Sequence, residues 1–232
     1  PAMTSEDNPK NIQVIFSDEF SEVDITKCEA RIGGAYYDTF EDAVNAAKAM
    51  ETEDTIVVTL LKDVEVESAM TVSTNVTIQN RVGRDITVYR GTGLAATNMI
   101  TVAQGATLKI AGVEDVDSIV LDGRTVTDSE AGKAVTEAAG STGSIVSNSG
   151  TVEMKNMTTQ YARKTAGAGA VILNVESKGA VIKTDNAKFS NNSADADAGG
   201  VFYTGGSNGT SVLKNTTFES NYAKKNGGVI GN

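Results

Sequence analysis

The sequence predicts an all-β fold, a parallel β-helix in which each repeat of the chain forms one coil of short strands. The first observation is a pattern of glycine, one small residue and two apolar residues. It recurs four times, at intervals of 26, 30 and 28 residues, in segments 143–146, 169–172, 199–202 and 227–230. A fixed period of this size indicates stacked supersecondary units rather than one globular core.

The second observation is the composition of each period. Short runs rich in Val, Ile, Leu and Thr, such as 151–154, 180–183 and 211–214, alternate with Gly, Asn, Ser and Asp. This is typical of strands and turns, and no apolar pattern of period 3.6 is long enough for a helix. The period therefore argues against helical and leucine-rich repeats. It favours coils whose strands pair with the coils above and below at about 4.8 Å.

Stacking in register places equivalent residues on top of each other. An inward-facing column is expected from the third residue of each pattern: Ile145, Val171, Val201 and Val229. An amide ladder interrupted once by threonine is expected five positions after each glycine: Asn148, Asn174, Thr204 and Asn232. A second block aligns Met157, Phe189 and Phe218, with Tyr161, Ser193 and Tyr222 four residues after them.

The last repeat carries a family resemblance. Phe218 is followed by Asn221, Ala223, a Gly-Gly pair and then Val229-Ile230. This order resembles the right-handed β-helix repeats of bacterial surface adhesins, often described as pectate-lyase-like. The resemblance covers 143–232 and, more loosely, 55–142. It implies a right-handed coil, but the scaffold carries lyases, hydrolases, adhesins and inert stalks, so it does not specify an activity.

The N-terminal part, 1–54, is expected to cap the array that follows in 55–232. Strands are expected at 12–16 and 23–30, and an amphipathic helix at 40–50 with Thr39 as its cap and Asp42 as a box-like partner. One face of this helix is apolar: Phe40, Ala43, Val44 and Ala47. We expect the helix to cover the exposed first coil. The alternative is a small separate α/β unit.

The early coils, 55–142, are less regular than the later ones. Strands are expected at 55–61, 64–66, around Val72, and at 76–78, 86–88, 99–102, 107–110 and 119–123. Segment 103–106 is predicted to be a turn, and 125–140 a protruding loop. At about 27 residues per coil the array holds roughly six or seven coils. Asn232 falls early in a new period, so we expect the natural protein to continue, and this fragment either to associate end to end or to fray from about Lys224 onward.

Composition narrows the possible partners. The chain has 232 residues, a formal charge of −10 and a sequence pI near 4.6. This disfavours nucleic acid, which needs clustered Lys and Arg, and no apolar run is long enough for membrane insertion. The single cysteine, Cys28, excludes an intramolecular disulfide and is expected to be a buried structural thiol.

The absence of histidine removes Ser-His-Asp and Cys-His catalysis and any histidine-ligated metal. No Asp-Asp pair and no calcium-loop spacing occur. The sequence therefore predicts no catalytic group, no metal and no cofactor. The candidate ligand-binding residues come from loops at equivalent places in three coils: Tyr161, Arg163, Lys164, Asp195, Asp197, Tyr222, Lys224 and Lys225. The alternative for these charges is a solvated, mutually neutralised loop surface.

The resemblance implies a non-enzymatic segment of a bacterial cell-surface or secreted adhesin, whose ligand would be a host glycan or protein. One alternative is a polysaccharide lyase or hydrolase of the same fold. In such a lyase, carboxylates hold calcium and an Arg or Lys acts as the base, and Arg163 and Lys164 are the nearest match. The other alternative is a purely structural stalk.

Overall fold

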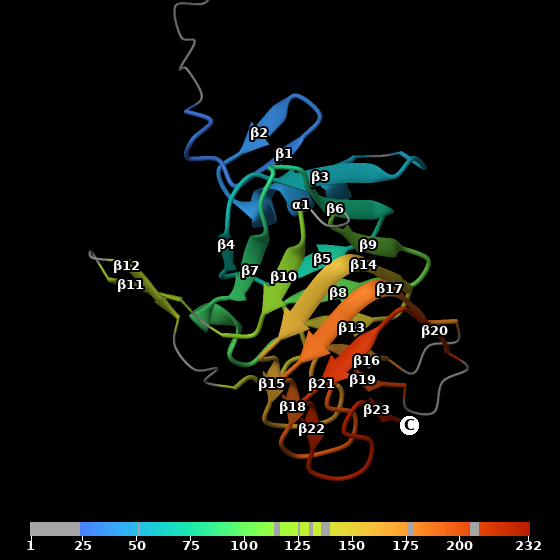
Figure 1. Ribbon diagram of the computed structural model, residues 1–232. Coiled ribbons are helices and arrows are strands. Elements are labelled where there is room, and N and C mark those ends of the chain that lie inside the picture. The colour runs from blue at the N-terminus through green and yellow to red at the C-terminus, as the bar shows by residue number, and fades with distance from the viewer. Residues whose placement is uncertain are drawn as a thin grey trace, which may run out of the picture.

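The structure, a computed structural model, describes residues 24–50, 52–113, 117–124, 126–129, 132–135, 140–175, 179–204 and 209–232. Within these ranges the protein is mostly β, with one α-helix, α1 (Phe40–Ala49). Most strands pair in parallel, and equivalent strands of successive repeats lie side by side (Figure 1). The strand expected at 12–16 lies outside the described residues.

Three faces of parallel strands make up the stack. The first face contains β3 (Ile56–Leu60), β6 (Val76–Asn80), β9 (Thr107–Ala111), the first halves of β14 (Thr151–Gln160) and β17 (Val181–Ser190), and β20 (Thr210–Lys214). The second contains β4 (Val64–Val66), β7 (Ile86–Arg90), β10 (Ile119–Asp122), the second halves of β14 and β17, and β21 (Thr217–Glu219). The third contains β5 (Met70–Val72), β8 (Ile100–Val102), β13 (Val146–Asn148), β16 (Ile172–Asn174), β19 (Phe202–Tyr203) and β23 (Ile230–Gly231).

Each face thus receives one strand from each of six successive repeats in the described part of the chain. A smaller parallel sheet joins β15 (Arg163–Lys164), β18 (Ser193–Ala194) and β22 (Tyr222–Ala223). One cluster of buried apolar side chains runs through the stack from α1 to β19. Alternation along the strands supplies this cluster, because side chains at every second position point to the same side of a strand.

The predicted register of the glycine pattern is confirmed. Val146 pairs with Ile172, which pairs with Phe202, which pairs with Ile230. The residues that precede these four form the expected inward column: Ile145, Val171 and Val201 are fully buried, and Val229 is partly buried against the core. In the last repeat, Ile230 is 43% exposed, whereas Phe202 in the repeat before it is fully buried.

The predicted alignment of the second block is wrong by two residues in one repeat. Phe189 pairs with Phe218 as expected, but its partner in β14 is Thr159, and Met157 pairs with Ala187. A slip of two residues keeps every side chain on the same side of the strand, so the apolar alternation could not reveal it. The structure instead shows a ring stack, with the centroids of Phe189 and Phe218 5.4 Å apart.

The expected amide ladder forms in part. Nδ2 of Asn148 donates to Oδ1 of Asn174 (2.9 Å) and to the carbonyl of Val181 (3.1 Å). Nδ2 of Asn174 is buried and has no partner among the described residues. This orphaned donor faces the repeat in which Thr204 replaces asparagine, so the ladder is interrupted where the sequence predicts.

A second amide ladder was not predicted. Nδ2 of Asn192, a fully buried side chain, donates to Oδ1 of Asn221 (3.0 Å) and to the carbonyl of Thr159 (3.2 Å). Its Oδ1 accepts from the backbone N–H of Ala162 (3.0 Å). This amide therefore joins three successive repeats just after the second face.

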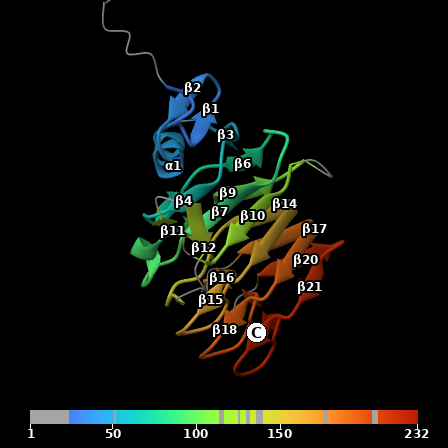
Figure 2. The same cartoon turned by 60° about the vertical axis from the view of Figure 1, so that its left-hand side comes forward.

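The N-terminal elements cover one end of the stack (Figure 2). The hydroxyl of Thr39 accepts the N–H of Asp42 (3.1 Å) and donates to its carboxylate (2.7 Å), as the predicted cap requires. The four residues expected on the apolar face of α1 are all buried: Phe40, Ala43, Val44 and Ala47. They belong to the same core cluster as the strands of the first repeats.

An antiparallel hairpin lies beside α1. It consists of β1 (Ala30–Ile32) and β2 (Ala35–Tyr37), and β1 also pairs antiparallel with β3. The strand expected at 23–30 is wrong for 24–29, where Asp24 instead closes a turn by accepting the hydroxyl of Thr26 (2.6 Å). Cys28 is 1% exposed, which confirms the expected buried thiol.

The expected loop at 125–140 contains a hairpin. Its strands, β11 (Val126–Ser129) and β12 (Gly132–Val135), pair antiparallel and stand away from the parallel sheets (Figure 1). The chain also forms one short 3-10 turn in the part described, η1 (Thr92–Leu94), ahead of β8. Across the described ranges, no helix has the length and apolar character needed to cross a membrane.

Candidate functional site

Of the predicted ligand-binding residues, Tyr161 precedes β15 and the others lie on or after β15, β18 and β22. We call the surface formed by Arg163, Asp195, Asp197, Tyr222, Lys224 and Lys225 the loop face. In-register backbone bonds bring its loops together, since the N–H of Asp195 donates to the carbonyl of Lys164 (2.8 Å). Nε of Arg163 lies 2.7 Å from the carboxylate of Asp195, and Nζ of Lys225 lies 3.3 Å from that of Asp197. The opposite charges therefore pair between neighbouring repeats.

These ion pairs are in contact with solvent. The side chain of Arg163 is 49% exposed and that of Lys225 is 63% exposed. Exposed pairs of this kind contribute about 0–1 kcal/mol each. The loop face is therefore a largely neutralised surface rather than a concentrated charge.

Lys164 does not belong to the loop face. It alternates with the outward-facing Arg163 on β15, so its side chain points inward and the residue is 4% exposed. Its Nζ donates to Oγ of Ser144 (2.9 Å) and to the carbonyl of Ala168 (2.7 Å). Burial, followed by the charge of Arg90, lowers the pKa of Lys164 from 10.5 to about 8.

This depressed pKa predicts a pH-dependent stability. Between pH 8 and 10.5 the unfolded chain binds the Lys164 proton more tightly than the folded chain does, so the free energy of unfolding should rise with pH. Relative to Lys164→Ala, the wild-type protein should gain about 2 kcal/mol over this range, discounted for solvent access. Urea unfolding at pH 7.5 and 10.5 measures the difference. A difference that stays constant with pH would contradict the burial of a charged Lys164.

The two predicted tyrosines do not form one aromatic surface. Tyr161 occupies the same position as Asn191 and Ser220, and all three have a positive φ, of 54°, 56° and 53°. The guanidinium of Arg124 lies over the Tyr161 ring, 4.0 Å from its centroid. Tyr222 occupies the position of Ser193 instead and is 56% exposed. Its exposed ring thus lies on the loop face without an aromatic partner from this column.

A groove that sequence reasoning missed follows the corner between the first and second faces. This corner groove has a volume of about 390 Å³ and is lined by, among others, Asn156, Asn186 and Asn215. All three asparagines have a positive φ, of 50°, 49° and 47°. Asn tolerates this left-handed conformation better than most residues, so it can bend each strand at this point. Their spacing of 30 and 29 residues was the available sequence signal.

Most of the side chains that line the corner groove are polar. Nδ2 of Asn186 donates to Oδ1 of Asn156 (3.1 Å), and Nδ2 of Asn215 donates to the carboxylate of Asp185 (3.1 Å). Lys188 also lines the groove and pairs with Glu219 at 2.8 Å. Successive repeats thus place amides one strand spacing apart along the groove, at about 4.8 Å.

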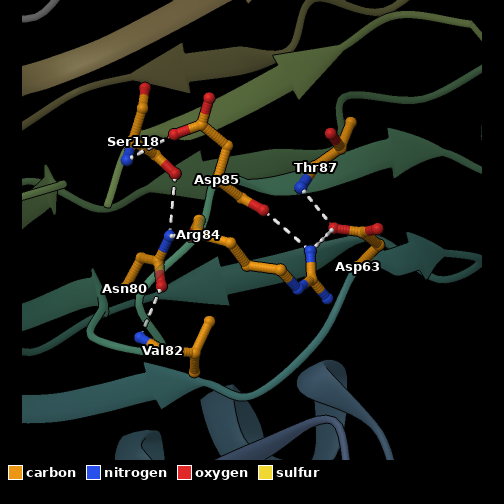
Figure 3. Close-up of polar contacts among 7 residues, drawn as sticks. All are labelled: Asp63, Asn80, Val82, Arg84, Asp85, Thr87 and Ser118. Carbon is orange, nitrogen blue, oxygen red and sulfur yellow. Dashed lines mark hydrogen bonds and ion pairs between the residues drawn. The ribbon is translucent and has the colours of Figure 1, made fainter. Parts of the chain in front are cut away.

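One wall of the corner groove is formed by Asp85 and Ser118. Figure 3 shows the N–H of Ser118 donating to the carboxylate of Asp85 (2.9 Å) and the amide of Asn80 donating to the carbonyl of Ser118 (2.8 Å). Arg84 bonds the carbonyl of Asp85 (2.7 Å) and the carboxylate of Asp63 (3.0 Å). The wall is therefore braced by hydrogen bonds across neighbouring repeats.

Within the ranges that the structure covers, no group of three or more carboxylate or thiol side chains is placed to hold a metal ion. The fold and the corner groove define an all-β protein of stacked parallel strands with a polar groove across its repeats. Comparison of the chain with protein-family models, with curated proteins and with solved structures finds no match.

Proposed function

We propose that the chain is a non-enzymatic segment of a bacterial cell-surface or secreted adhesin, and that its stacked sheets are the faces of a right-handed parallel β-helix displaying a binding surface. The observation that supports this proposal is the corner groove. Its amides repeat along the stack at a fixed interval, and each amide group can both donate and accept hydrogen bonds. A repeating row of such groups suits a ligand that itself repeats and carries many hydroxyls, namely a host glycan.

The loop face supports the same proposal in a different way. Arg163 and Lys225 are held by carboxylates of the neighbouring repeat, and Lys164 is turned into the interior. A lyase of this fold would instead need a cation free to act as a base on its substrate. The proposed ligand therefore binds at the corner groove rather than at the loop face.

A glycan array probed with the purified chain tests the proposal, because it samples many host sugars at once. We expect binding to a defined set of glycans, and Asn186→Gly should weaken it about tenfold by removing one amide. Glycine keeps the positive φ at this position, so the backbone is preserved. Asn191→Gly is the matched control, since Asn191 has the same conformation but does not line the groove.

The array result has two ways of contradicting the proposal. Equal loss of binding in Asn186→Gly and Asn191→Gly would remove the corner groove from the binding surface. Absence of binding to every glycan on the array would contradict a glycan ligand and favour a structural stalk.

The absence of turnover is a separate prediction. We expect no unsaturated product from pectate or other uronic-acid polymers, with or without calcium, because Arg163 and Lys225 are held in ion pairs and no metal-holding group accompanies them among the described residues. Ultraviolet absorbance of the unsaturated product measures this directly. Absorbance that appears with wild-type protein and is lost in Arg163→Ala would overturn the non-enzymatic proposal in favour of a lyase.

A further inference from the structure

A small cavity lies at the end of β7. In each repeat the asparagines of the corner groove come before the strand of the second face, whereas this cavity lies after it. It has a volume of about 110 Å³. Its lining is built from small residues around one cation: Arg90, Gly91, Thr92, Ala95, Gly123, Gly140 and Ser141. At about 30 Å³ per water molecule, the cavity holds three or four waters or one group of similar size.

Arg90 is the charged group of this cavity, and it is 5% exposed. Its Nη2 donates to the hydroxyl of Ser141 (2.7 Å) and to the carbonyls of Leu94 (3.2 Å) and Thr97. Its Nε is buried and has no hydrogen-bond partner. A guanidinium has five N–H donors, so Arg90 retains donors that no described residue accepts.

No carboxylate neutralises Arg90 among the described residues. Glu67 lies by the same loop, but its carboxylate accepts the N–H of Gly93 (3.1 Å) and forms no ion pair with Arg90. Asp122 is fully buried and is engaged by Arg124 (2.6 Å) and Gln160 (2.8 Å). Burial alone lowers the pKa of Arg90 to about 10.

A second buried cation, Lys164, adds to the uncompensated positive charge of this region. Lys164 lies in the same interior region, because it forms a β-bridge with Ser141, whose hydroxyl accepts a hydrogen bond from Arg90. The hydrogen bonds of Lys164 go to a hydroxyl and a carbonyl, neither of which is charged. Burying a cation without an anion is costly, and removing solvent from two of them compounds that cost.

We propose that this cavity binds a small oxyanion, a sulfate, phosphate or carboxylate group, through the guanidinium of Arg90. Charge-assisted hydrogen bonds from arginine to such groups are short and strong. The anion would be either a free ion or an acidic group carried by a glycan. The inference does not depend on the proposed adhesin function, because it rests on a different cavity.

Thermal unfolding of the whole chain tests the inference in sodium chloride, sulfate, phosphate and acetate at matched ionic strength. Sulfate and phosphate stabilise proteins in general, so the comparison is with Arg90→Gln, which retains that general effect. We expect a saturable rise of roughly 5 °C in wild-type protein beyond the rise in the variant. A sulfated oligosaccharide at low salt distinguishes an acidic group on a glycan from a free ion.

Ala95, an exposed residue that lines the cavity, provides a test that does not depend on the stability of Arg90→Gln. Ala95→Glu should place a carboxylate at Arg90, raise the unfolding temperature in chloride and abolish the oxyanion-specific rise. Ala95→Gln is the control of the same shape without the charge. The proposal is overturned if wild-type protein and Arg90→Gln respond equally to the oxyanions, or if Ala95→Glu and Ala95→Gln respond as the wild-type protein does.

Discussion

Replacing Val201 by Asp should lower the free energy of unfolding by about 4 kcal/mol or more. Val201 is fully buried in the inward column, and the N–H and carbonyl groups around it are engaged in the third face. A carboxylate there would lie among apolar side chains without a partner, which is among the most destabilising single changes known. Urea unfolding followed by circular dichroism at pH 7 measures the loss.

The matched control is Val212→Asp, because Val212 is a strand valine that is 52% exposed. Its expected change is within about 0.5 kcal/mol. Burial raises the pKa of the new carboxyl in Val201→Asp, so its destabilisation should be present at pH 7 and should shrink as the pH falls towards 4. Equal effects of the two substitutions would mean that the glycine-pattern register is not the one that packs the core.

Replacing Gly199 by Ala should cost about 3 kcal/mol or more. Gly199 has a φ of +70°, and an added Cβ would lie 2.2 Å from the carbonyl oxygen of Phe202. The left-handed conformation alone costs about 1–2 kcal/mol for a residue with a Cβ. The close approach adds to this, because the backbone of a packed repeat must move to relieve it. Gly169 and Gly227 have the same conformation in the adjoining repeats, with φ of 69° and 67°.

Two other glycines separate the causes of this loss. Gly105 has a φ of +81° with nothing within 4 Å of its Cβ position, so Gly105→Ala should cost only the conformational part, about 1 kcal/mol. Gly34 has neither a positive φ nor a close neighbour, so Gly34→Ala should change the free energy of unfolding by less than about 0.5 kcal/mol. A loss in Gly199→Ala no larger than that in Gly105→Ala would exclude the steric part of the argument.

Much of the architecture follows from local sequence patterns. The repeated glycine pattern predicted the pairing of Val146, Ile172, Phe202 and Ile230, because only one register superimposes its glycines. The helix at Phe40 was predictable to within one residue, since Thr39 and Asp42 form a cap that marks its beginning. The interruption of the amide ladder at Thr204 was predictable for the same reason, because stacking in register makes each sequence position a column.

The candidate sites were harder to predict from such sequence patterns. The alignment of Met157 was wrong because a two-residue slip preserves the alternation that sequence reasoning relies on. Lys164 was assigned to the surface because charged residues are rarely buried, yet its position on β15 turns it inward. The strand assigned to 23–30 failed because the turn chemistry of Asp24 and Thr26 prevailed over an apolar alternation.

The sequence by itself determined the period, the strand content, the capped helix and the inward apolar column, because each depends on residues close in the chain or repeated at a fixed interval. Only the tertiary structure decided where the corner groove lies and that Arg90 and Lys164 share an interior in which no described residue supplies a counter-charge. Both depend on which side of each strand faces the interior and on the loops that converge there. Burial and electrostatic pairing are properties of that convergence, and no single stretch of the chain specifies them.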